Sequence, residues 1–411
     1  MEELKTYRLA DICNSIQTGP FGSQLHKSDY VEFGTPIVMP KDITNGKIND
    51  NNISRISKND VARLFKHKLV PGNIIYPRRG DISKCALITS KEDGWVCGTG
   101  CIKVDINQQI ANSTYVMYVL CQSETVNWIE SNAVGTTMLN LNTSILSDLP
   151  IKLPSLNTQK KLANIVSSFD NKIALNRRIN DNLEQQAQAL FKSWFVDFEP
   201  FKDGKFVDSE MGMIPEGWKV VQLGEIIEIS KRIINPQKNP DKIFYHYSLP
   251  ACDNGLIPEI QSGKDIMSNK IILQNNTILF SKLNPRIKRI WFACDVLNDS
   301  ICSTEFIPYR AKNERESVYI YSIINSDSFY ASVLGCVNGA TGSHQRFHAE
   351  DTLGLLFPYK KDIVDKYIDL VKPVLAEIHK LRIENKTLAL TRDSLLPRLM
   401  SGELKFNDLN N

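Results

Sequence analysis

The sequence lacks the features of exported, membrane-spanning and zinc-binding proteins. It has no signal pattern at its N-terminus and no run of about eighteen apolar residues, so we expect neither export nor membrane insertion. Its nine cysteines include no CxxC pair, and only Cys97 and Cys101 lie close together in the sequence. We therefore expect a cytoplasmic protein with reduced thiols and without a zinc site.

Catalytic motifs are missing as well. Gly46-Lys47, Gly204-Lys205 and Gly263-Lys264 each lack the preceding glycine and the following Ser or Thr of a phosphate-binding GxxxxGK loop. No Asn-Pro-Pro-Tyr or Asp-Pro-Pro-Tyr element for amino-group methylation occurs, and no glycine-rich cofactor loop follows a strand pattern. We predict that this chain has no catalytic residues and binds no cofactor of its own.

An excess of one charge sign is also absent. The chain has 49 Lys and Arg against 46 Asp and Glu, which gives a formal net charge of +3. This balance excludes polyanion binding by the whole surface, so any contact with nucleic acid must come from local clusters. With 411 residues, 42% of them apolar and 23% charged, the chain is expected to be globular and to form two or more domains.

What the chain does contain is a repeat. A globular stretch followed by a long amphipathic helix occurs twice, and four short segments recur in one order with a nearly constant offset. The matched segments are 9–12 with 223–226, 72–76 with 276–280, 97–99 with 302–304, and 134–154 with 341–358. A chain built in this way presents two similar surfaces related by a pseudo-twofold axis.

The globular stretches are expected to be α+β. Short β-branched and aromatic runs, separated by Gly, Asn, Pro and Asp, predict strands near 35–39, 72–76, 84–89, 271–273 and 289–293. One helix is predicted over 113–131, and its counterpart over 317–334. We expect the loops of these domains to carry the function.

Two long helices are predicted, over about 157–195 and 362–399. Their seam residues recur at heptad spacing. In the first helix these are Leu162, Phe169, Asn176, Leu183 and Leu190, interleaved with Ile165 and Ile179. In the second they are Val364, Val371, Ile378, Asn385, Arg392 and Leu399, interleaved with Tyr367, Val374, Leu381, Leu388 and Leu395. Pro373 is expected to kink or restart the second helix, and Gly402 to end it.

Geometry then predicts how the helices run. The first leaves domain one and the second leaves domain two, so packing along a shared seam requires antiparallel helices, each about 60 Å long at a rise of about 1.5 Å per residue. Asn176 and Asn385 occupy equivalent heptad positions, where a polar residue is better explained by register selection than by stability. We place both near the pseudo-axis, as the register residues of the spacer helices.

The predicted fold is therefore α+β: two strand-rich domains joined by two long antiparallel coiled-coil helices with pseudo-twofold symmetry. The predicted boundaries are 1–155 for domain one, 156–198 for the first spacer helix, 199–360 for a linker and domain two, 361–403 for the second spacer helix, and 404–411 for a C-terminal tail.

Two basic clusters fall at repeat-equivalent places. One holds Arg78, Arg79 and Lys84, and the other Lys282, Arg286, Lys288 and Arg289. A single cluster of this kind is more typical of a solvated hairpin loop, but recurrence at equivalent positions favours binding to a polyanion. Two such loops held at a set separation suggest a reader of a two-part DNA site, whose half-sites are spaced by whole turns of about 34 to 36 Å.

At this point the chain resembles the specificity subunit of type I restriction-modification systems, over residues 5–406. The residues that carry the resemblance are Gly19-Pro20-Phe21-Gly22-Ser23-Gln24-Leu25, Arg78-Arg79-Gly80-Asp81-Ile82, the stretch 183–201, Ile214-Pro215-Glu216-Gly217-Trp218, and the stretch 395–403. The part from Phe191 to Phe201 is the most specific. Domain one departs from the pattern because it opens without the Ile-Pro-x-Gly-Trp phrase.

The resemblance implies a division of labour. Each globular domain would be a target recognition domain that reads one half of an asymmetric bipartite site in double-stranded DNA. The helices would set the gap and dock two adenine methyltransferase (M) subunits, and restriction/translocase (R) subunits would complete the complex. Those partners would use S-adenosylmethionine, ATP and Mg for adenine N6 methylation or restriction, while this chain would be a non-catalytic subunit with no membrane contact.

Candidate DNA contacts follow from chemistry. Phosphates call for Lys, Arg or exposed amides, whereas bases call for Arg to guanine and Asn or Gln to adenine. For each Ser, Thr and His, an ordinary loop role is the alternative. The candidates in domain one are Ser23, Gln24, His26, Lys27, Arg78, Arg79, Lys84, Thr136, Thr137 and Asn140. Those in domain two are Lys282, Asn284, Arg286, Lys288, Arg289, Ser343, His344, Gln345 and Arg346.

Two further patterns each have a plainer alternative. His344 and His348 are spaced i,i+4, but no carboxylate or cysteine lies at ligand spacing, so we interpret them as loop residues and not as metal ligands. Trp194, Phe195 and Phe198 cluster beyond the end of the seam. Core packing would explain them, but we favour a docking patch for the methyltransferase.

Two other classes of protein are weighed against the DNA reader. A coiled-coil scaffold without a DNA role explains the heptads but leaves the repeated basic loops unexplained. A self-contained DNA enzyme would need the catalytic motifs that the sequence lacks.

Overall fold

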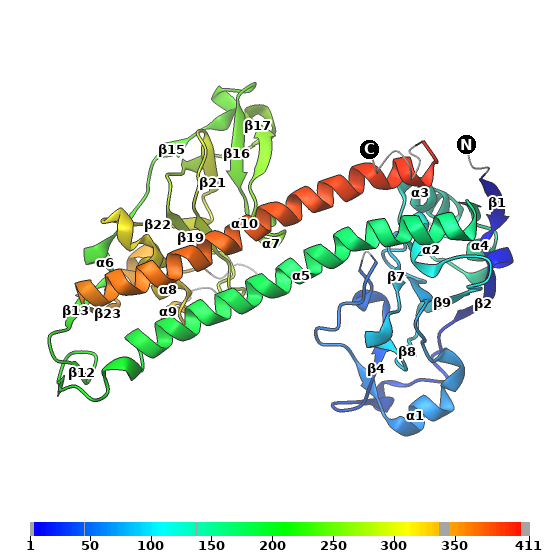
Figure 1. Ribbon diagram of the computed structural model, residues 1–411, viewed down its shortest axis with the longest axis horizontal. Helices are drawn as coiled ribbons and strands as arrows, with labels where there is room; N and C mark the ends of the chain where they lie inside the picture. Colours follow the sequence, from blue (N-terminus) through cyan, green and yellow to red (C-terminus); the bar gives the residue numbers. More distant parts are fainter. Residues whose placement is uncertain (1–3, 45, 136–138, 337–345, 404–411) are drawn as a thin grey trace. The chain divides into compact units, whose positions relative to one another are not determined.

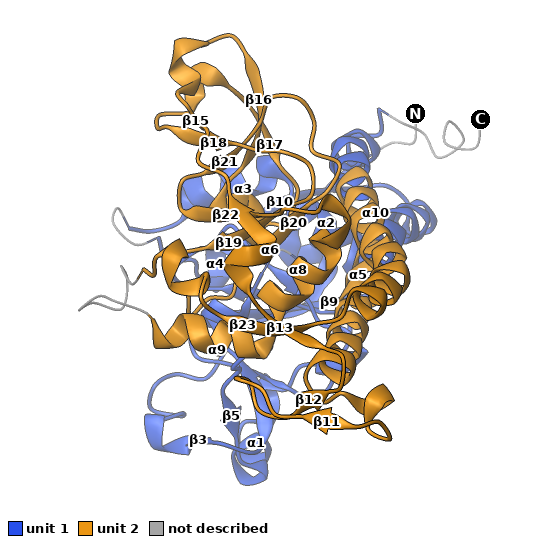
Figure 2. Ribbon diagram, turned by 90° about the vertical axis from the view of Figure 1, so that its left-hand side faces the viewer, with its two compact units in different colours: residues 1–172, 388–411 blue, residues 173–387 orange. Residues whose placement is uncertain are grey.

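The computed structural model describes residues 4–44, 46–135, 139–336 and 346–403 (Figure 1). Packing divides the chain into two compact units: unit 1, Met1–Lys172 with Leu388–Asn411, and unit 2, Ile173–Thr387 (Figure 2). Both divisions fall inside the long helices α5 (Leu156–Phe195) and α10 (Lys361–Met400). Each unit therefore holds one globular domain and part of each helix.

Unit 1 contains two four-stranded sheets, ordered β2-β9-β6-β7 and β3-β5-β4-β8, and a separate pair β1-β10. Its strands are β1 (Lys5–Arg8), β2 (Cys13–Thr18), β3 (Tyr30–Val31), β4 (Thr35–Val38), β5 (Arg55–Ile56), β6 (Asn73–Pro77), β7 (Ala86–Leu87), β8 (Val96–Cys97), β9 (Cys101–Ile106) and β10 (Pro150–Leu153). Its shorter helices are α1 (Lys58–Arg63), α2 (Ser113–Leu120), α3 (Ser123–Asn132) and α4 (Thr143–Ser147). Strand β6 is buried at every position, and Ile74, Ile75 and Tyr76 form its apolar centre.

Unit 2 contains a four-stranded sheet ordered β14-β22-β19-β20 and a five-stranded sheet ordered β15-β18-β21-β16-β17, with two further pairs, β11-β12 and β13-β23. Its strands are β11 (Phe206–Val207), β12 (Ile214–Pro215), β13 (Lys219–Gln222), β14 (Ile227–Ile229), β15 (Ile233–Ile234), β16 (Ile243–Tyr247), β17 (Glu259–Ser262), β18 (Lys270–Ile272), β19 (Thr277–Ser281), β20 (Ile290–Ala293), β21 (Ser300–Ser303), β22 (Phe306–Ala311) and β23 (Leu356–Tyr359). Its shorter helices are α6 (Leu223–Ile226), α7 (Leu249–Asp253), α8 (Ser317–Asn325) and α9 (Asp327–Gly335).

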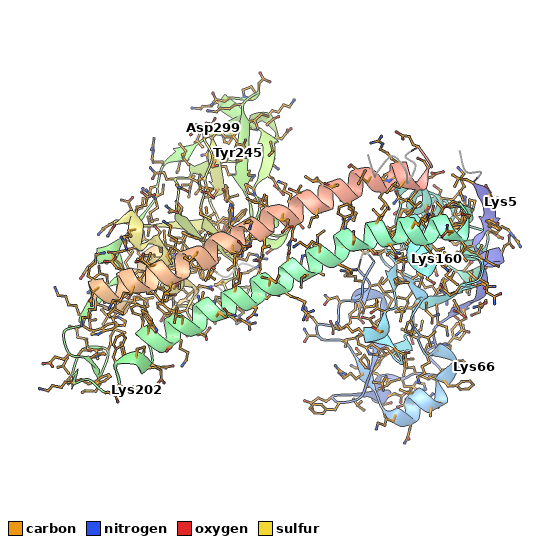
Figure 3. The ribbon with its side chains drawn as sticks, viewed as in Figure 1. Lys5, Lys66, Lys160, Lys202, Tyr245 and Asp299 are labelled. Atoms are coloured by element: carbon orange, nitrogen blue, oxygen red, sulfur yellow. The ribbon has the colours of Figure 1, made fainter. Side chains whose placement is uncertain are left out.

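Strand pairing confirms the predicted repeat. In unit 1, β9 lies between β2 and β6, and in unit 2, β22 lies between β14 and β19. Ile74 pairs with Val104, and Ile278 pairs with Tyr309, so the matched segments 72–76 and 276–280 form equivalent central strands. A parallel pair also recurs, β4 with β8 and β16 with β21. Beside the second of these pairs, the Tyr245 N–H donates to the Asp299 carbonyl at 3.2 Å (Figure 3).

Each of the two shorter helices predicted from the sequence is in fact a pair of helices. Helices α2 and α3 cover 113–132, and α8 and α9 cover 317–335. Ser326 is extended, and its side chain accepts a hydrogen bond from the Phe329 N–H, so it ends α8 and caps α9. Gln122 is likewise extended between α2 and α3. Apolar residues lie on both sides of each break, although the residues at the breaks, 122–125 and 325–328, are polar. The prediction of one helix joined the apolar segments across these polar residues.

The long helices begin and end within one residue of the predicted positions. Helix α10 continues through Pro373, so the predicted restart there is wrong. Gly402 has φ +74° and follows the helix end, as predicted. In unit 2, the side chain of Asn176 contacts that of Asn385, and the Tyr367 hydroxyl donates to the Ala187 carbonyl, so the helices are antiparallel there, as predicted.

The buried face of α5 differs from the prediction in one row. Leu162 and Asn176 are buried as expected, but the interleaved buried row is Val166, Ile173, Asn180 and Ala187. Ile179, which was predicted for that row, is 36% exposed. Positions i+3 and i+4 lie near the same helix face, and the polar Asn180 and small Ala187 weaken the apolar signal of the true row.

Both long helices contribute to the core of each unit. In unit 1, Leu162 and Val166 of α5 pack into one cluster with Leu396 and Leu399 of α10. In unit 2, Phe191 and Phe195 of α5 share a cluster with Val364, Tyr367 and Val371 of α10. Within each unit, burial of these side chains therefore fixes the helices against the globular domain.

Candidate DNA interface

The loop from Arg78 to Lys84 connects β6 to β7 in unit 1. Gly80 has φ +84°, a conformation that a residue without Cβ adopts readily, and this allows the turn. Lys84 Nζ lies 2.7 Å from Asp81 Oδ2, and this hydrogen bond lowers the pKa of the Asp81 carboxyl below its usual value. Arg79 is exposed and has no ion pair among the described residues. Arg79 is thus the cation of this loop that is most available to DNA.

Asn140 lies beside this loop. A backbone bridge joins Arg79 to Asn140, and the Leu141 N–H donates to the Arg78 carbonyl at 2.9 Å. Arg78 is half-buried, and its Nε is buried without a hydrogen-bond partner in the described part of the chain. The structure therefore brings together Arg78, Arg79 and Asn140, three of the predicted contacts, although Asn140 is distant in sequence.

The segment that holds Ser23, Gln24, His26 and Lys27 lies between β2 and β3, and all four residues are exposed. The Phe21 N–H donates to Gln24 Oε1 at 3.1 Å, so the segment is an ordered turn. Within the residues that the structure describes, no hydrogen bond joins this turn to Arg78 or Arg79. Its proposed DNA contact therefore depends on exposure and residue type alone.

The loop from Lys282 to Arg289 connects β19 to β20, the place in unit 2 that is equivalent to the Arg78–Lys84 loop. Leu283 forms a backbone bridge with Arg346, just as Arg79 does with Asn140. Arg286 is exposed, and Asn284 has φ +49°, a left-handed turn conformation that asparagine tolerates. The two units thus hold equivalent loops of different sequence, each bridged to the segment that follows a helix pair.

Arg289 has a structural role that the sequence did not indicate. It donates two hydrogen bonds to the Asp253 carboxylate, at 2.6 and 2.9 Å, and its side chain is 16% exposed. These bonds raise the pKa of the Arg289 guanidinium and join β20 to the end of α7. Two of the five guanidinium N–H donors of Arg289 are therefore used within the fold, which leaves Arg289 less available to DNA than the exposed Arg286.

Two more predicted cations of unit 2 also have partners. Lys288 Nζ donates to the Asn325 carbonyl at 2.6 Å and lies over the Tyr330 ring. Arg346 pairs with Glu305 at 3.0 and 3.2 Å, although half of its side chain is exposed. Arg286 is the exposed arginine of the loop that has no ion pair among the described residues.

Some predicted residues cannot be placed. Thr136, Thr137, Ser343, His344 and Gln345 lie outside the described residues. The interpretation of His344 and His348 as loop residues and not metal ligands therefore stays a prediction, because His344 is one of these residues.

Polar side chains join α5 to α10 in both units. In unit 2, the fully buried Asn176 donates from Nδ2 to Asn385 Oδ1 at 3.0 Å and to Glu384 Oε2 at 2.9 Å. In unit 1, Asp170 accepts hydrogen bonds from Arg392 and from the Tyr118 hydroxyl. Asn176 and Asn385 therefore contact each other within unit 2, and their role in selecting the helix register stays a prediction.

Known proteins of one family are similar to this chain over most of its length. Residues 1–185 match the model of the type I restriction modification DNA specificity domain. The MjaIX specificity subunit of Methanocaldococcus jannaschii is 26% identical in an alignment of 402 residues that covers 91% of this chain and 88% of that protein. The MjaVIII specificity subunit of the same organism is 31% identical over 330 residues, 75% of this chain and 74% of that protein. This chain belongs to the type I restriction enzyme specificity subunits.

The fold agrees with this family. The crystal structure of the S subunit of a type I restriction-modification system from M. genitalium superposes with a TM-score of 0.59 at 17% identity, covering 97% of this chain and 96% of that one. As a specificity subunit, the chain recognises DNA sequence and is not a catalytic subunit. Both alternatives, the scaffold without a DNA role and the self-contained enzyme, are thereby excluded. No helix in the described part of this specificity subunit has enough consecutive apolar sequence to cross a membrane.

The aromatic phrase near the end of α5 lies in the core of this specificity subunit. Phe195 is 2% exposed, and its ring centroid lies 4.9 Å from that of Tyr319 and 5.7 Å from that of Trp218. Phe198 is 9% exposed and contacts Trp218 at 5.4 Å. The predicted docking patch is therefore wrong for Phe195 and Phe198, whereas Trp194 is only partly buried. The sequence signal for this packing is Trp218 in the Ile-Pro-Glu-Gly-Trp segment, because its ring contacts those of both Phe195 and Phe198.

Sequence spacing also missed a group of three side chains in the specificity subunit whose atoms lie close enough to hold a metal ion. Cys294, Asp295 and His379 place one potential ligand atom each within 4.8 Å of the others. Because His379 lies on α10 and the other two follow β20, no short motif could reveal them.

Proposed function

We propose that each unit reads one part of an asymmetric, two-part site in double-stranded DNA. Unit 1 would read through the Arg78–Lys84 loop and unit 2 through the Lys282–Arg289 loop, while α5 and α10 set the unread gap between the two parts. The observation that supports this proposal most is the equivalence of the loops. Each connects the last two strands of a four-stranded sheet, β6 to β7 in unit 1 and β19 to β20 in unit 2, yet their sequences differ. Similar frames with different loops suit two different target sequences.

The exposed cations support a direct reading role. Arg79 and Arg286 are exposed and have no ion pair among the described residues, so their guanidinium groups can bind a guanine edge or a phosphate. Asn284 lies in the same loop as Arg286, and Asn140 is bridged to Arg79, but the side-chain oxygen of each asparagine is buried. The two arginines are therefore the residues of this set that are open to a base. Arg289 is left out of this set because Asp253 holds it.

We further propose that the long helices dock two adenine methyltransferase (M) subunits and that restriction (R) subunits join the same complex. S-adenosylmethionine, ATP and Mg would then be bound by those partners and not by this chain. The family supports this division, because the similar proteins are named as the specificity subunits of restriction enzymes. Because the fold repeats in the two units, two identical methyltransferase subunits would each have an equivalent docking surface.

Methylation mapping tests this function. A host that lacks other adenine methyltransferases expresses the chain together with its neighbouring methyltransferase, and its genome is sequenced for N6-methyladenine. We expect methylation at one motif with two specified parts around an unspecified gap. Methyltransferase expressed alone is the control and should leave no such motif. A continuous methylated motif would contradict the proposal. The proposal would also be refuted if no motif appeared and no DNA duplex shifted in a binding assay.

A further inference from the structure

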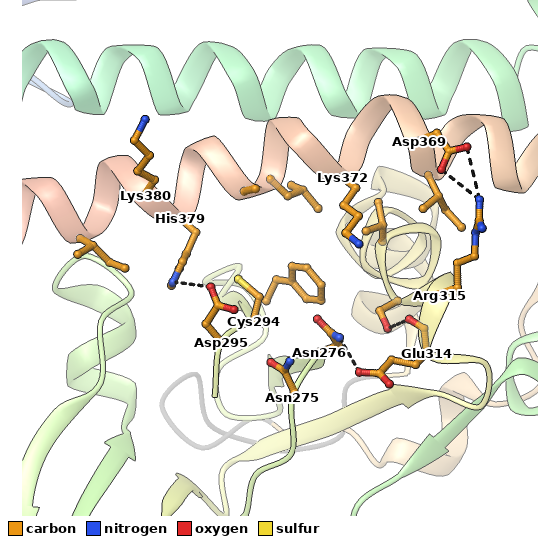
Figure 4. Close-up of a pocket in the computed structure, with 17 residues that line it drawn as sticks. Asn275, Asn276, Cys294, Asp295, Glu314, Arg315, Asp369, Lys372, His379 and Lys380 are labelled. Carbon is orange, nitrogen blue, oxygen red and sulfur yellow. Dashed lines mark hydrogen bonds and ion pairs between the residues drawn. The ribbon is translucent and has the colours of Figure 1, made fainter. Parts of the chain in front are cut away.

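A cleft of about 800 Å³ lies in unit 2 between α10, the start of α8 and the segments that flank β19 and β20. Several charged side chains in it already have partners: Arg315 pairs with Asp369 at 3.1 Å, and Glu314 accepts a hydrogen bond from Asn276 at 2.8 Å. Figure 4 shows Cys294, Asp295 and His379 at one end of this cleft, with His379 reaching from α10 toward Asp295.

The distances within this group fit metal coordination better than hydrogen bonding. His379 Nε2 and Asp295 Oδ2 are 3.7 Å apart, which is beyond hydrogen-bond length, and the Cys294 thiol lies within 4.8 Å of both. Ligands of a tetrahedral ion, bound at about 2.0 to 2.3 Å, are separated from one another by about 3.3 to 3.8 Å. Small side-chain rotations would therefore bring all three donor atoms onto one ion.

We propose that Cys294, Asp295 and His379 bind one divalent ion of the zinc type, with a water molecule from the cleft as the fourth ligand. Thiolate, imidazole and carboxylate are the donors that zinc takes in proteins, and three protein ligands with one open position form a four-coordinate site. The charges also balance, since one thiolate and one carboxylate neutralise a divalent cation.

The site would link the reading hairpin to the spacer helix. Cys294 and Asp295 directly follow β20, the strand that closes the Lys282–Arg289 loop, whereas His379 lies on α10. A bound ion would therefore fix that hairpin to the helix within unit 2. This role is independent of which DNA sequence the loop reads.

Cobalt(II), a spectroscopic substitute for zinc, provides the direct test on the full-length chain. We expect one equivalent of Co²⁺ to produce a thiolate-to-cobalt charge-transfer band and the intense visible bands of tetrahedral coordination, both abolished by one equivalent of Zn²⁺. Cys294→Ser should remove the charge-transfer band, and His379→Gln should weaken Zn²⁺ binding at least about tenfold in calorimetry. Cys336→Ser and His348→Gln, in the same unit but outside the group, are the matched controls and should bind as the wild type does.

Thermal melting distinguishes loss of the site from loss of the fold. Without metal, Cys294→Ser should melt at the wild-type temperature, and Zn²⁺ should raise the melting temperature of the wild type but not that of the variant. The proposal is overturned if the wild type shows no charge-transfer band. It is equally overturned if Cys294→Ser and the control variants bind Zn²⁺ alike, which would mean surface binding only.

Discussion

Asn176 Nδ2 donates a hydrogen bond to Asn385 Oδ1 at 3.0 Å and so joins the two long helices of this specificity subunit. Asn176 is completely buried, and Ile173 and Leu381, the apolar neighbours of this pair on the two helices, are buried as well. A buried asparagine that contacts a half-buried one costs stability but favours the one alignment in which the Asn176 amide N–H groups find acceptors on the other helix. The pair is therefore suited to select the register of α5 against α10.

Replacing both asparagines by leucine should uncouple stability from register. We expect Asn176→Leu with Asn385→Leu to change the helix alignment or the oligomeric state, because Leu accepts several registers equally well. Light scattering after size-exclusion chromatography would measure the oligomeric state. Cross-linking of cysteines placed along the two helices would measure their alignment. Asn182→Leu, on the exposed face of α5, is the control and should change neither. A double variant that only melts at a higher temperature would refute the register role.

Phe195 should behave as a core residue and not as a docking residue. Phe195→Ala removes a ring that is 2% exposed, so we expect the free energy of unfolding to fall by about 3 to 5 kcal/mol in urea titration. The neighbouring Val196 is 47% exposed, and Val196→Ala should stay within about 0.5 kcal/mol of the wild type. If Phe195→Ala kept wild-type stability and lost only methyltransferase binding, the docking interpretation would be restored.

The Arg289–Asp253 pair should contribute to stability and not to DNA specificity. A double-mutant cycle with Arg289→Ala and Asp253→Ala should give a coupling energy of about 1 kcal/mol, a modest value because half of the Asp253 side chain is exposed to solvent. Urea unfolding measures it. Methylation by the Arg289→Ala chain should keep the wild-type motif, and a relaxed motif would return Arg289 to the reading surface.

Acidification should destabilise unit 2 through His246. Burial lowers the pKa of this imidazole below its ordinary 6.5, an effect that nearby Lys270 strengthens and that Gln261 and Glu259 oppose. Between the lowered pKa and 6.5, the unfolded chain binds more protons than the folded chain, so stability rises with pH and is lost as pH falls. The urea midpoint should therefore be lower at about pH 5.5 than at about pH 7.5. His246→Gln should reduce that difference, and an unchanged difference would assign it to other groups.

Much of the fold could be predicted because its signals are local. The runs at 72–76 and 276–280 each end in three consecutive apolar residues, which favours a strand, and they became the buried strands β6 and β19. The heptads gave the ends of α5 and α10 to within one residue. The breaks at Gln122 and Ser326 were missed because one extended residue separates the two helices at each place, and only Ser326 caps the following helix with its side chain.

The site was less predictable because its contacts are distant in sequence. Residue type alone makes Arg289 a candidate DNA contact, but the fold pairs it with Asp253. Arg79 and Asn140 are neighbours only because a backbone bridge joins them. Cys294 and His379 meet only because β20 and α10 pack in the same unit. Residue type and spacing nominate candidates, whereas tertiary packing decides which donors stay free.

The central claim is that each unit reads its own part of the target, and a pair of methylation maps tests it most directly. Arg79→Ala and Arg286→Ala chains are expressed separately with the methyltransferase, with Lys264→Ala, an exposed cation of unit 2 outside the loop, as the control. We predict that Arg79→Ala relaxes or weakens one part of the motif and Arg286→Ala the other part, each by about 1 to 3 kcal/mol of discrimination at the affected base. Equal loss at both parts in either variant would contradict independent reading by the two units.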